Sequence, residues 1–360
     1  MEENQNGRRP QRVSAYSEWQ KQEGIPVHRG SYVSDLYTAD VASWPRMGQK
    51  GAFINLADQE EDDGHIIDIA PGGQTNVIHH MYESTIFVLE GRGATTLWQK
   101  GKPKQTVEWQ RGSLFSPPLN SSYQHFNLDG QKSARLFAVT NAPMVFNLFR
   151  STDYVFGDEY AFADRYDAED DYFTNPGTHL GIRRWETNFV PDVRTFKLDE
   201  YHERGAGGNN MRIRFANNQM ECHISEFPPG TYKKAHKHGV GAFVLILSGV
   251  GYSMLWFSGE ERGKVDWKDG SVLSPKEMEY HQHFNTGPDR AKYLALRLGH
   301  LDRTGNEGRD GLPISTISER EGGWQVDYED EDPSIFRLYE EECAEHGAKV
   351  VLPKPVYASR

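Results

Sequence analysis

The residues of this chain best suited to metal chemistry are four His in its C-terminal half. His236 and His238 are two positions apart and precede an apolar run, AFVLIL. His281 and His283 repeat this spacing further along the chain. Side chains two positions apart on a strand point to the same face, so each pair places two imidazoles on one face. Imidazoles that converge inside a barrel are costly to bury unless they share a metal ion. The pattern predicts a metal site.

The elements that must position these His belong to a duplicated domain. Two segments of the chain fall into register without a gap when the sequence is shifted by the distance between Trp109 and Trp267, which is 158 positions. A duplication is the first feature to seek in a sequence, because it determines the architecture. The residues in register include Gly93 and Gly251, Trp98 and Trp256, Ser113 and Ser271, and Gln124-His-Phe-Asn127 and Gln282-His-Phe-Asn285.

Each copy consists of short β-branched and aromatic runs that end in Gly-rich turns. Many short strands with little helical periodicity predict an all-β barrel or jelly roll, in which closure hides the sheet edges. Asp332 as N-cap, Pro333 at the first helical position and Gly347 as a stop predict one short C-terminal helix. The predicted organisation is an N-terminal arm (1–50), barrel 1 (51–150), an ordered connecting segment (151–205), barrel 2 (206–302) and a tail with the helix (303–360).

Composition limits the classes of function. The 360 residues carry a formal net charge of −12, which argues against a surface built to bind nucleic acid. The two Cys cannot form a disulfide framework or a multi-thiolate zinc site, and suit a reducing compartment. No apolar run approaches the ~20 residues of a membrane span, and no secretion signal is recognisable. We expect a cytoplasmic protein without nucleic-acid or membrane partners, assembled as a homodimer or higher homo-oligomer.

The motifs around the His resemble those of a known superfamily. Gly230-x5-His236-x-His238, followed by Gly270-x4-Pro275 and His281-x3-Asn285, resembles the two metal motifs of the cupins. Two copies resemble a bicupin, over residues 65–140 and 223–299, which is under half of the chain. The second motif departs by one extra residue before His281 and by Glu277 near the usual Gly. The resemblance implies two jelly-roll barrels and a metal held by His236, His238 and His281.

Ala242 stands where cupins usually place a Glu ligand. Three neutral His without a carboxylate resemble the site of gentisate-type ring-cleaving dioxygenases, which hold Fe(II). The resemblance implies an Fe(II) enzyme that uses O2 to cleave a carbon–carbon bond of a small aromatic or diketone-like anion. Mn, Zn, Ni and Cu remain alternatives. His283 is a candidate fourth ligand or a hydrogen-bond partner of a ligand.

The first copy lacks part of the motif. Ile78 and Tyr123 stand at the positions of His236 and His281. His80, Glu83 and His125 remain as a second, incomplete site. Because His125 and His283 recur although one site is degenerate, a role in the fold or beside the ligands is favoured over ligation for this position.

Four further residues are candidates for substrate binding. Arg212 and Arg214 alternate on a predicted strand and would clamp a carboxylate. Tyr252 and Trp256 share a strand face and would line an aromatic pocket. The alternatives, a solvated strand face and core packing, are favoured by the pattern.

Two other functions fit the same motifs. A Mn-dependent decarboxylase or lyase of the oxalate type requires a Glu in each site, and Ala242 counts against it. A non-catalytic bicupin that binds a small molecule would consume no O2. Membership of the superfamily indicates a fold more firmly than a reaction.

Overall fold

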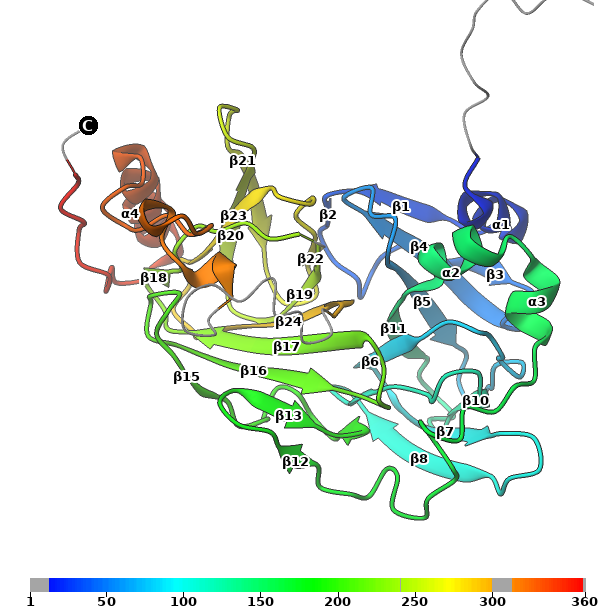
Figure 1. Ribbon diagram of the computed structural model, residues 1–360. Coiled ribbons are helices and arrows are strands. Elements are labelled where there is room, and N and C mark those ends of the chain that lie inside the picture. Colours follow the sequence, from blue (N-terminus) through cyan, green and yellow to red (C-terminus); the bar gives the residue numbers. More distant parts are fainter. Residues whose placement is uncertain (1–12, 240, 300–312, 359–360) are drawn as a thin grey trace, which may run out of the picture.

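Two β-barrels lie side by side in the computed structural model, which describes residues 13–239, 241–299 and 313–358 (Figure 1). Each barrel pairs one large sheet with one small sheet. Helices are few and lie at the two ends of the molecule. The all-β architecture with two jelly-roll barrels that the sequence predicts is confirmed.

Barrel 1 places its strands in a large sheet of order β1-β4-β5-β11-β6-β9-β14, with β3 beside β4, and a small sheet of order β10-β7-β8. The strands are β1 (Val27–Gly30), β3 (Ala42–Trp44), β4 (Gln49–Leu56), β5 (Asp63–Ile69), β6 (Ser84–Glu90), β7 (Arg92–Trp98), β8 (Gln105–Gln110), β9 (Leu114–Phe115), β10 (Ser122–Asn127), β11 (Ala134–Thr140) and β14 (Phe189–Val190).

Barrel 2 repeats this plan with a large sheet of order β12-β13-β16-β17-β24-β19-β22-β2, with β15 beside β16, and a small sheet of order β18-β23-β20-β21. The strands are β2 (Tyr32–Val33), β12 (Thr178–His179), β13 (Arg184–Glu186), β15 (Asp199–Tyr201), β16 (Gly208–Arg214), β17 (Met220–Phe227), β18 (Thr231–Tyr232), β19 (Phe243–Ser248), β20 (Gly251–Trp256), β21 (Gly263–Trp267), β22 (Val272–Leu273), β23 (Tyr280–Asn285) and β24 (Ala291–Leu298).

The α-helices of the described residues flank the barrels. The predicted C-terminal helix is α4 (Pro333–His346), in which the Asp332 side chain accepts a hydrogen bond from the Ser334 N–H and Gly347 ends the helix in the left-handed conformation. Three short helices were not expected from the weak helical periodicity: α1 (Ala15–Glu23), α2 (Ala142–Phe149) and α3 (Thr152–Gly157). They pack together through aromatic rings, such as Trp19 on Phe146 at 4.6 Å between centroids. The 3₁₀ turns η2 (Ile314–Thr316) and η3 (Glu319–Glu321) precede α4 within the described residues. No helix in the described ranges is long and apolar enough to cross a membrane.

The N-terminal arm and the connecting segment tie the barrels together. Strand β1 of the arm pairs with β4 of barrel 1, and β2 pairs with β22 of barrel 2. From the connecting segment, β14 extends the large sheet of barrel 1. Between the barrels the large sheets share one apolar core, in which Phe137 and Phe243 lie 6.2 Å apart. One face of each large sheet packs in this shared core, so the opposite face lines the interior of its own barrel.

The alternation along β17 identifies the interior of barrel 2. Cys222 and Ile224 belong to the core shared with barrel 1. The intervening His223 and Ser225 therefore face the opposite side, into barrel 2. Residues paired across neighbouring strands share a face, so Tyr293 of β24, opposite Ser225, also lines the interior.

Candidate metal centre

Three imidazoles converge at one point of the barrel 2 interior. His236, His238 and His281 each offer a ring nitrogen, and the three nitrogens all lie within 4.8 Å of one another. The ring centroids of His236 and His281 are 4.1 Å apart, and those of His238 and His281 are 4.7 Å apart. The three-His group expected from the motifs is present.

The local backbone structure determines the orientation of these three rings. His281 lies on β23, whereas His236 and His238 lie in an extended segment after β18 that is joined to β23 by a single bridge and not by a continuous ladder. In the bridge, His236 N–H donates to His281 O at 3.1 Å and His281 N–H donates to His236 O at 2.9 Å. The strand predicted for the first His pair is therefore reduced to this bridge and a second isolated bridge, between His236 and Gln325.

Hydrogen bonds leave the Nε2 atoms of two rings available as ligands. His281 Nδ1 lies 3.2 Å from Glu279 O, and His236 Nδ1 lies 3.4 Å from Lys234 O. A carbonyl accepts only, so each Nδ1 carries the proton and each Nε2 keeps its lone pair. Burial lowers the pKa of His281 to about 4 and also lowers that of His236, where Arg204 and the neighbouring His add to the effect. The rings are thus neutral near pH 7, which is the form that binds a metal.

No carboxylate completes this group among the described residues. Ala242 is buried and packs with apolar residues of the barrel interior. The donor set is therefore three imidazole nitrogens, which suits a divalent transition metal such as Mn, Fe or Zn and leaves positions for an anionic ligand. The residues present fit such an ion.

His283 lies next to the group but outside it. Its ring centroid is 5.7 Å from that of His281, and its Nδ1 lies 2.7 Å from Ser253 Oγ, which also accepts a hydrogen bond from Trp267 Nε1 at 3.0 Å. Barrel 1 contains the same arrangement, because His125 Nδ1 lies 2.7 Å from Thr95 Oγ1, which accepts from Trp109 Nε1. Equivalent glycines, Gly93 and Gly251, make room for the two Trp rings. Recurrence in both barrels indicates a role in the fold.

In barrel 1 the corresponding residues serve other contacts. His80 Nε2 lies 2.8 Å from the Tyr123 hydroxyl, and its Nδ1 lies 2.8 Å from Tyr82 O. Glu83 accepts hydrogen bonds from Arg165 and from the backbone N–H groups of Gln219 and Met220. The structure does not bring His80, Glu83 and His125 together, and among the described residues barrel 2 holds the one candidate group.

The interior of barrel 2 carries more positive than negative charge. Arg204 is buried and donates to neutral partners, the Ser315 backbone O and Gln325 Oε1. Lys233 is also buried and donates to Ser225 Oγ at 2.5 Å and to the Tyr293 hydroxyl at 3.0 Å. Neither cation has a salt bridge to a carboxylate in the described part of the chain.

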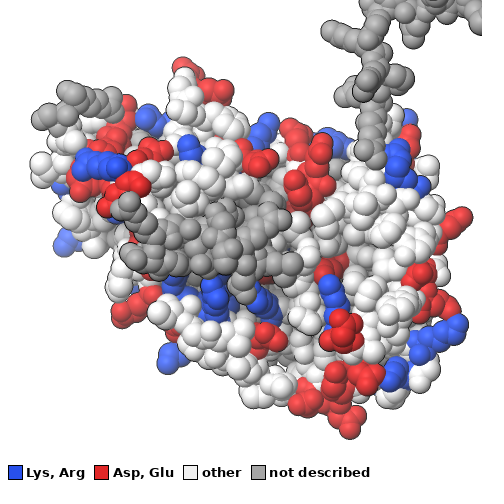
Figure 2. Space-filling view, viewed as in Figure 1, with Lys and Arg blue, Asp and Glu red and all other residues white. Residues whose placement is uncertain are grey.

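These residues were missed by the sequence reasoning. Lys233 lies within the first His motif, three positions before His236, and that spacing was the available signal. Arg204 comes from the connecting segment, and only the three-dimensional fold brings it beside the His. Basic side chains also gather over β16 and β17 on the face shown in Figure 2.

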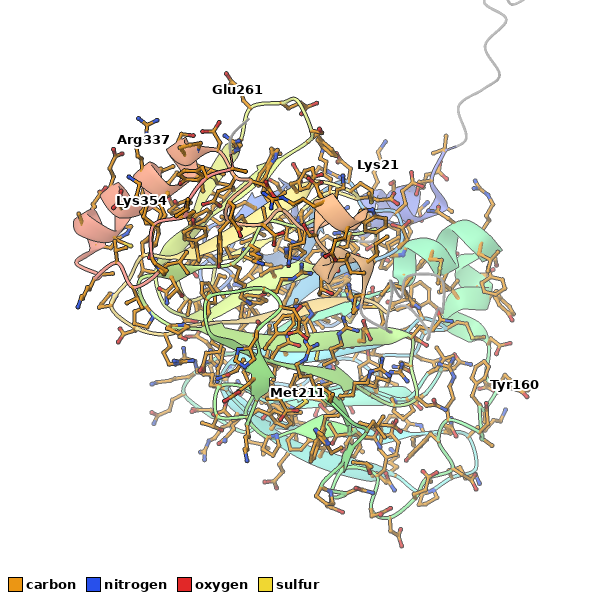
Figure 3. The ribbon with its side chains drawn as sticks, turned by 60° about the vertical axis from the view of Figure 1, so that its left-hand side comes forward. Lys21, Tyr160, Met211, Glu261, Arg337 and Lys354 are labelled. Carbon is orange, nitrogen blue, oxygen red and sulfur yellow. The ribbon has the colours of Figure 1, made fainter. Side chains whose placement is uncertain are left out.

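The predicted substrate residues divide between two faces. Arg212 pairs in register with His223 and therefore faces the interior, as does Arg214, opposite Glu221. Tyr252 stacks on Phe284 at 4.4 Å and Trp256 stacks on Tyr280 at 5.4 Å between centroids. Both lie on the outer face of the small sheet, beside the cluster that packs under α4, where Figure 3 labels Arg337. The structure does not bring these two rings to the three-His group.

A buried carboxyl joins the C-terminal segment to the strand that carries His281. Glu331 accepts hydrogen bonds from the Tyr232 hydroxyl and from Gln282 Nε2. Burial raises the pKa of Glu331 from 4.5 to about 7, against the lowering effect of the two hydrogen bonds.

We therefore predict that Glu331→Gln changes how stability depends on pH. The folded protein binds the Glu331 proton more tightly than the unfolded chain, so this group makes the wild type less stable as the pH rises from about 4.5 to 7. The loss in melting temperature between pH 5 and pH 8 should be smaller in Glu331→Gln by on the order of 5 °C. Thermal unfolding at both pH values tests this, with the exposed Glu340→Gln as control. An equal loss in all three proteins would contradict it.

Comparisons with known proteins show which solved structures share the fold of this chain. No protein-family model matches the chain, and no curated protein matches it. A deletion mutant of Bacillus subtilis oxalate decarboxylase is similar in structure (TM-score 0.51, 13% identity, covering 75% of this chain and 77% of that one). The formate complex of Lactobacillus farciminis oxalate decarboxylase is also similar (TM-score 0.52, 14% identity, covering 75% of this chain and 86% of that one). A further similar structure is the Bacillus subtilis enzyme studied for its Mn(II) centres (TM-score 0.52, 13% identity, covering 75% of this chain and 78% of that one). The chain therefore has the two-barrel fold of the bicupin oxalate decarboxylases, with a three-His group in its second barrel.

Proposed function

We propose that this protein is a metal-dependent enzyme, of decarboxylase type and with Mn(II) as its metal, that cleaves a carbon–carbon bond of a small carboxylate anion inside barrel 2. The observation that carries the proposal is the three-His group beside buried cations without a carboxylate partner. A buried charge without a counterion is costly, so a bound anion is the natural partner of Arg204 and Lys233. The solved structures of similar fold support the decarboxylase and Mn(II) rather than the Fe(II) dioxygenase that the three-His pattern first suggested.

The ion would be held by His236, His238 and His281, and would supply Lewis-acid polarisation of the carboxylate. Arg204 neutralises and orients the anion from the side of Gln325, which pairs with His236. The apolar residues of the interior exclude water, which strengthens these charge interactions.

Tyr293 is placed to supply the proton that decarboxylation requires. When the carbon–carbon bond breaks, its electron pair stays on the substrate carbon, CO2 leaves and a proton must be added to that carbon. Lys233 Nζ donates to the Tyr293 hydroxyl at 3.0 Å and leaves the phenolic proton free for transfer. Burial by itself would raise the pKa of Tyr293, but Lys233, Ser225 and Arg204 together outweigh it and lower the pKa below the ordinary value of 10.

Tyr293→Phe should therefore lower kcat by about a hundredfold or more, since a general acid contributes that much. The metal content and the affinity for the anion should stay as in the wild type, because the ligands and Arg204 are unchanged. In the wild type, kcat should fall as the pH rises through the lowered pKa of Tyr293, and this limb should be absent in the variant. A kcat against pH profile for both proteins tests this, and an unchanged kcat would exclude Tyr293 as the proton donor.

One observation keeps the Fe(II) dioxygenase as a second candidate. Ala242 leaves the site without the carboxylate that an oxalate-type decarboxylase is expected to require. Parallel assays of the Mn- and Fe-loaded protein separate the two reactions. CO2 release from a carboxylate without stoichiometric O2 uptake supports the decarboxylase. O2 uptake matched to product, with hydroxylated aromatic acids or diketones and Fe only, would support the dioxygenase instead. Metal-independent binding without turnover would leave a non-catalytic binding protein.

A further inference from the structure

A second group of basic side chains lines barrel 2 away from the three His. Arg212 on β16 and His223 on β17 are paired in register, on the face that also carries Ser225. The neighbouring residues of the opposite face, Met211 and Cys222, pack in the core between the barrels. Arg212 and His223 therefore point into barrel 2, Arg212 from β16, on which Figure 3 labels Met211, and His223 from the neighbouring β17.

Arg212 has no salt bridge to a carboxylate among the described residues, although the charge of nearby Glu221 acts on it and partly offsets the lowering of its pKa. Burial lowers the pKa of its guanidinium, and Arg297 adds to this lowering. Glu221, the nearby carboxylate, instead accepts from Arg297 Nε at 3.2 Å and Nη2 at 2.7 Å. A recessed guanidinium with five donors and no acceptor in the described structure is a site for an oxyanion.

His223 lies where several cations converge. Its pKa is lowered by burial first, and then by Arg297, Arg212, Lys233 and Arg204. Its ring lies 5.9 Å from that of Tyr293, and no hydrogen bond of the imidazole occurs within the described residues. An anion bound here would meet an imidazole N–H and the Arg212 guanidinium at once.

This group is separated from the metal centre by the width of the barrel. The three His belong to the small sheet side, and the nearest ring of the large sheet, Tyr293 on β24, lies 5.3 Å from His283. Arg212 is on β16, two strands beyond β24 in the large sheet, which is ~10 Å at the usual strand spacing. The charge of Arg204 affects residues of both groups, since it lowers the pKa of His281 and of His223.

We propose that Arg212 and His223 form a second anion subsite, and that the substrate is a dicarboxylate whose two carboxylates are separated by a carbon chain. One carboxylate lies at the metal centre and the other at Arg212, with Arg204 between them. This inference rests on the proposed function of barrel 2. Oxalate, whose carboxylates are bonded directly to each other, is too short to reach both ends.

Isothermal titration of the Mn(II)-loaded protein with acetate, oxalate, succinate and glutarate tests the subsite. The wild type should bind succinate or glutarate at least about tenfold more tightly than acetate, because a second charge pair forms. Arg212→Met should weaken binding of the longer dicarboxylates by about 30-fold and leave oxalate unchanged, and Arg212→Lys should restore part of the affinity. Arg290→Met, which removes an exposed cation paired with Glu226, is the control for net charge.

Each outcome decides the question. Selective loss of the longer dicarboxylates in Arg212→Met supports the subsite. Metal-dependent binding of oxalate in the wild type, with Arg212→Met unaffected for all four ligands, would overturn the subsite and leave the proposed function intact. No binding of any carboxylate in the presence of Mn(II) would overturn both. Equal weakening of oxalate and glutarate would place Arg212 at the metal centre and also overturn the inference.

Discussion

His281→Gln should lose tight metal binding and activity together. His281 supplies one of three ring nitrogens that lie within 4.8 Å of one another, and the amide of Gln cannot reproduce the lone pair of an imidazole at that position. Residues that only support a ligand already affect metal affinity by 10- to 100-fold, so we expect a loss of about a hundredfold or more. Metal titration monitored by calorimetry, followed by an assay of CO2 release, measures both effects.

The chain offers a matched control in its other barrel. His125 is a buried imidazole on β10, the barrel 1 equivalent of His283, and has the same Thr–Trp environment. His125→Gln should leave the metal content and activity as in the wild type, apart from any loss of stability. Activity that survives in His281→Gln, or metal that is lost in His125→Gln, would contradict the assignment of the site to barrel 2.

Arg204→Met should abolish most of the affinity for carboxylate anions without a matching loss of stability. Truncating one partner of a buried charge pair costs about 2–5 kcal/mol, which corresponds to a loss of about 30-fold to several thousandfold in affinity. In the anion-free protein the variant gives up hydrogen bonds to Ser315 and Gln325, but it also removes a buried charge that has no carboxylate partner among the described residues. The melting temperature without ligand should therefore change little.

Lys234→Met is the control for this experiment. Lys234 is adjacent in sequence to the buried Lys233 but is paired with Asp327 at 2.7 Å, so its charge is already neutralised. Its removal should leave anion affinity within about twofold of the wild type, as surface and partly exposed ion pairs contribute little. If Arg204→Met destabilises the protein strongly and binds carboxylates normally, Arg204 is a structural residue and does not hold the substrate.

The fold and the three-His group were predictable because their signals are local or repeated. The shared offset between Trp109 and Trp267 reveals the duplication without any knowledge of contacts. The His236-x-His238 spacing and the β-run around His281 place ligands on neighbouring elements of one barrel. The C-terminal helix was also predictable, because Asp332, Pro333 and Gly347 are end signals that act within a few residues.

Arg212 and Arg214 were candidates from the sequence, but the charged interior as a whole could not be predicted, because it depends on long-range pairing. Arg204 reaches the His from the connecting segment, and Arg212 faces the barrel only because the opposite face of β16 packs on barrel 1. The pattern favoured core packing for Tyr252 and Trp256, but it could not show that their cluster packs under α4, a helix that is distant in sequence. The three helices near Trp19 are short, and their stability comes from aromatic packing rather than from periodicity.

The most direct test of the account is the number of metal ions per chain. The protein should be purified without added metal, reconstituted separately with Mn(II) and Fe(II) under anaerobic conditions, freed of excess metal and analysed for metal content, alongside His281→Gln. The account predicts one ion per wild-type chain and none in the variant, because among the described residues one group of three ligands is present. A wild-type protein that retains neither metal, or a variant that retains as much as the wild type, would contradict the central claim that barrel 2 is a metal centre.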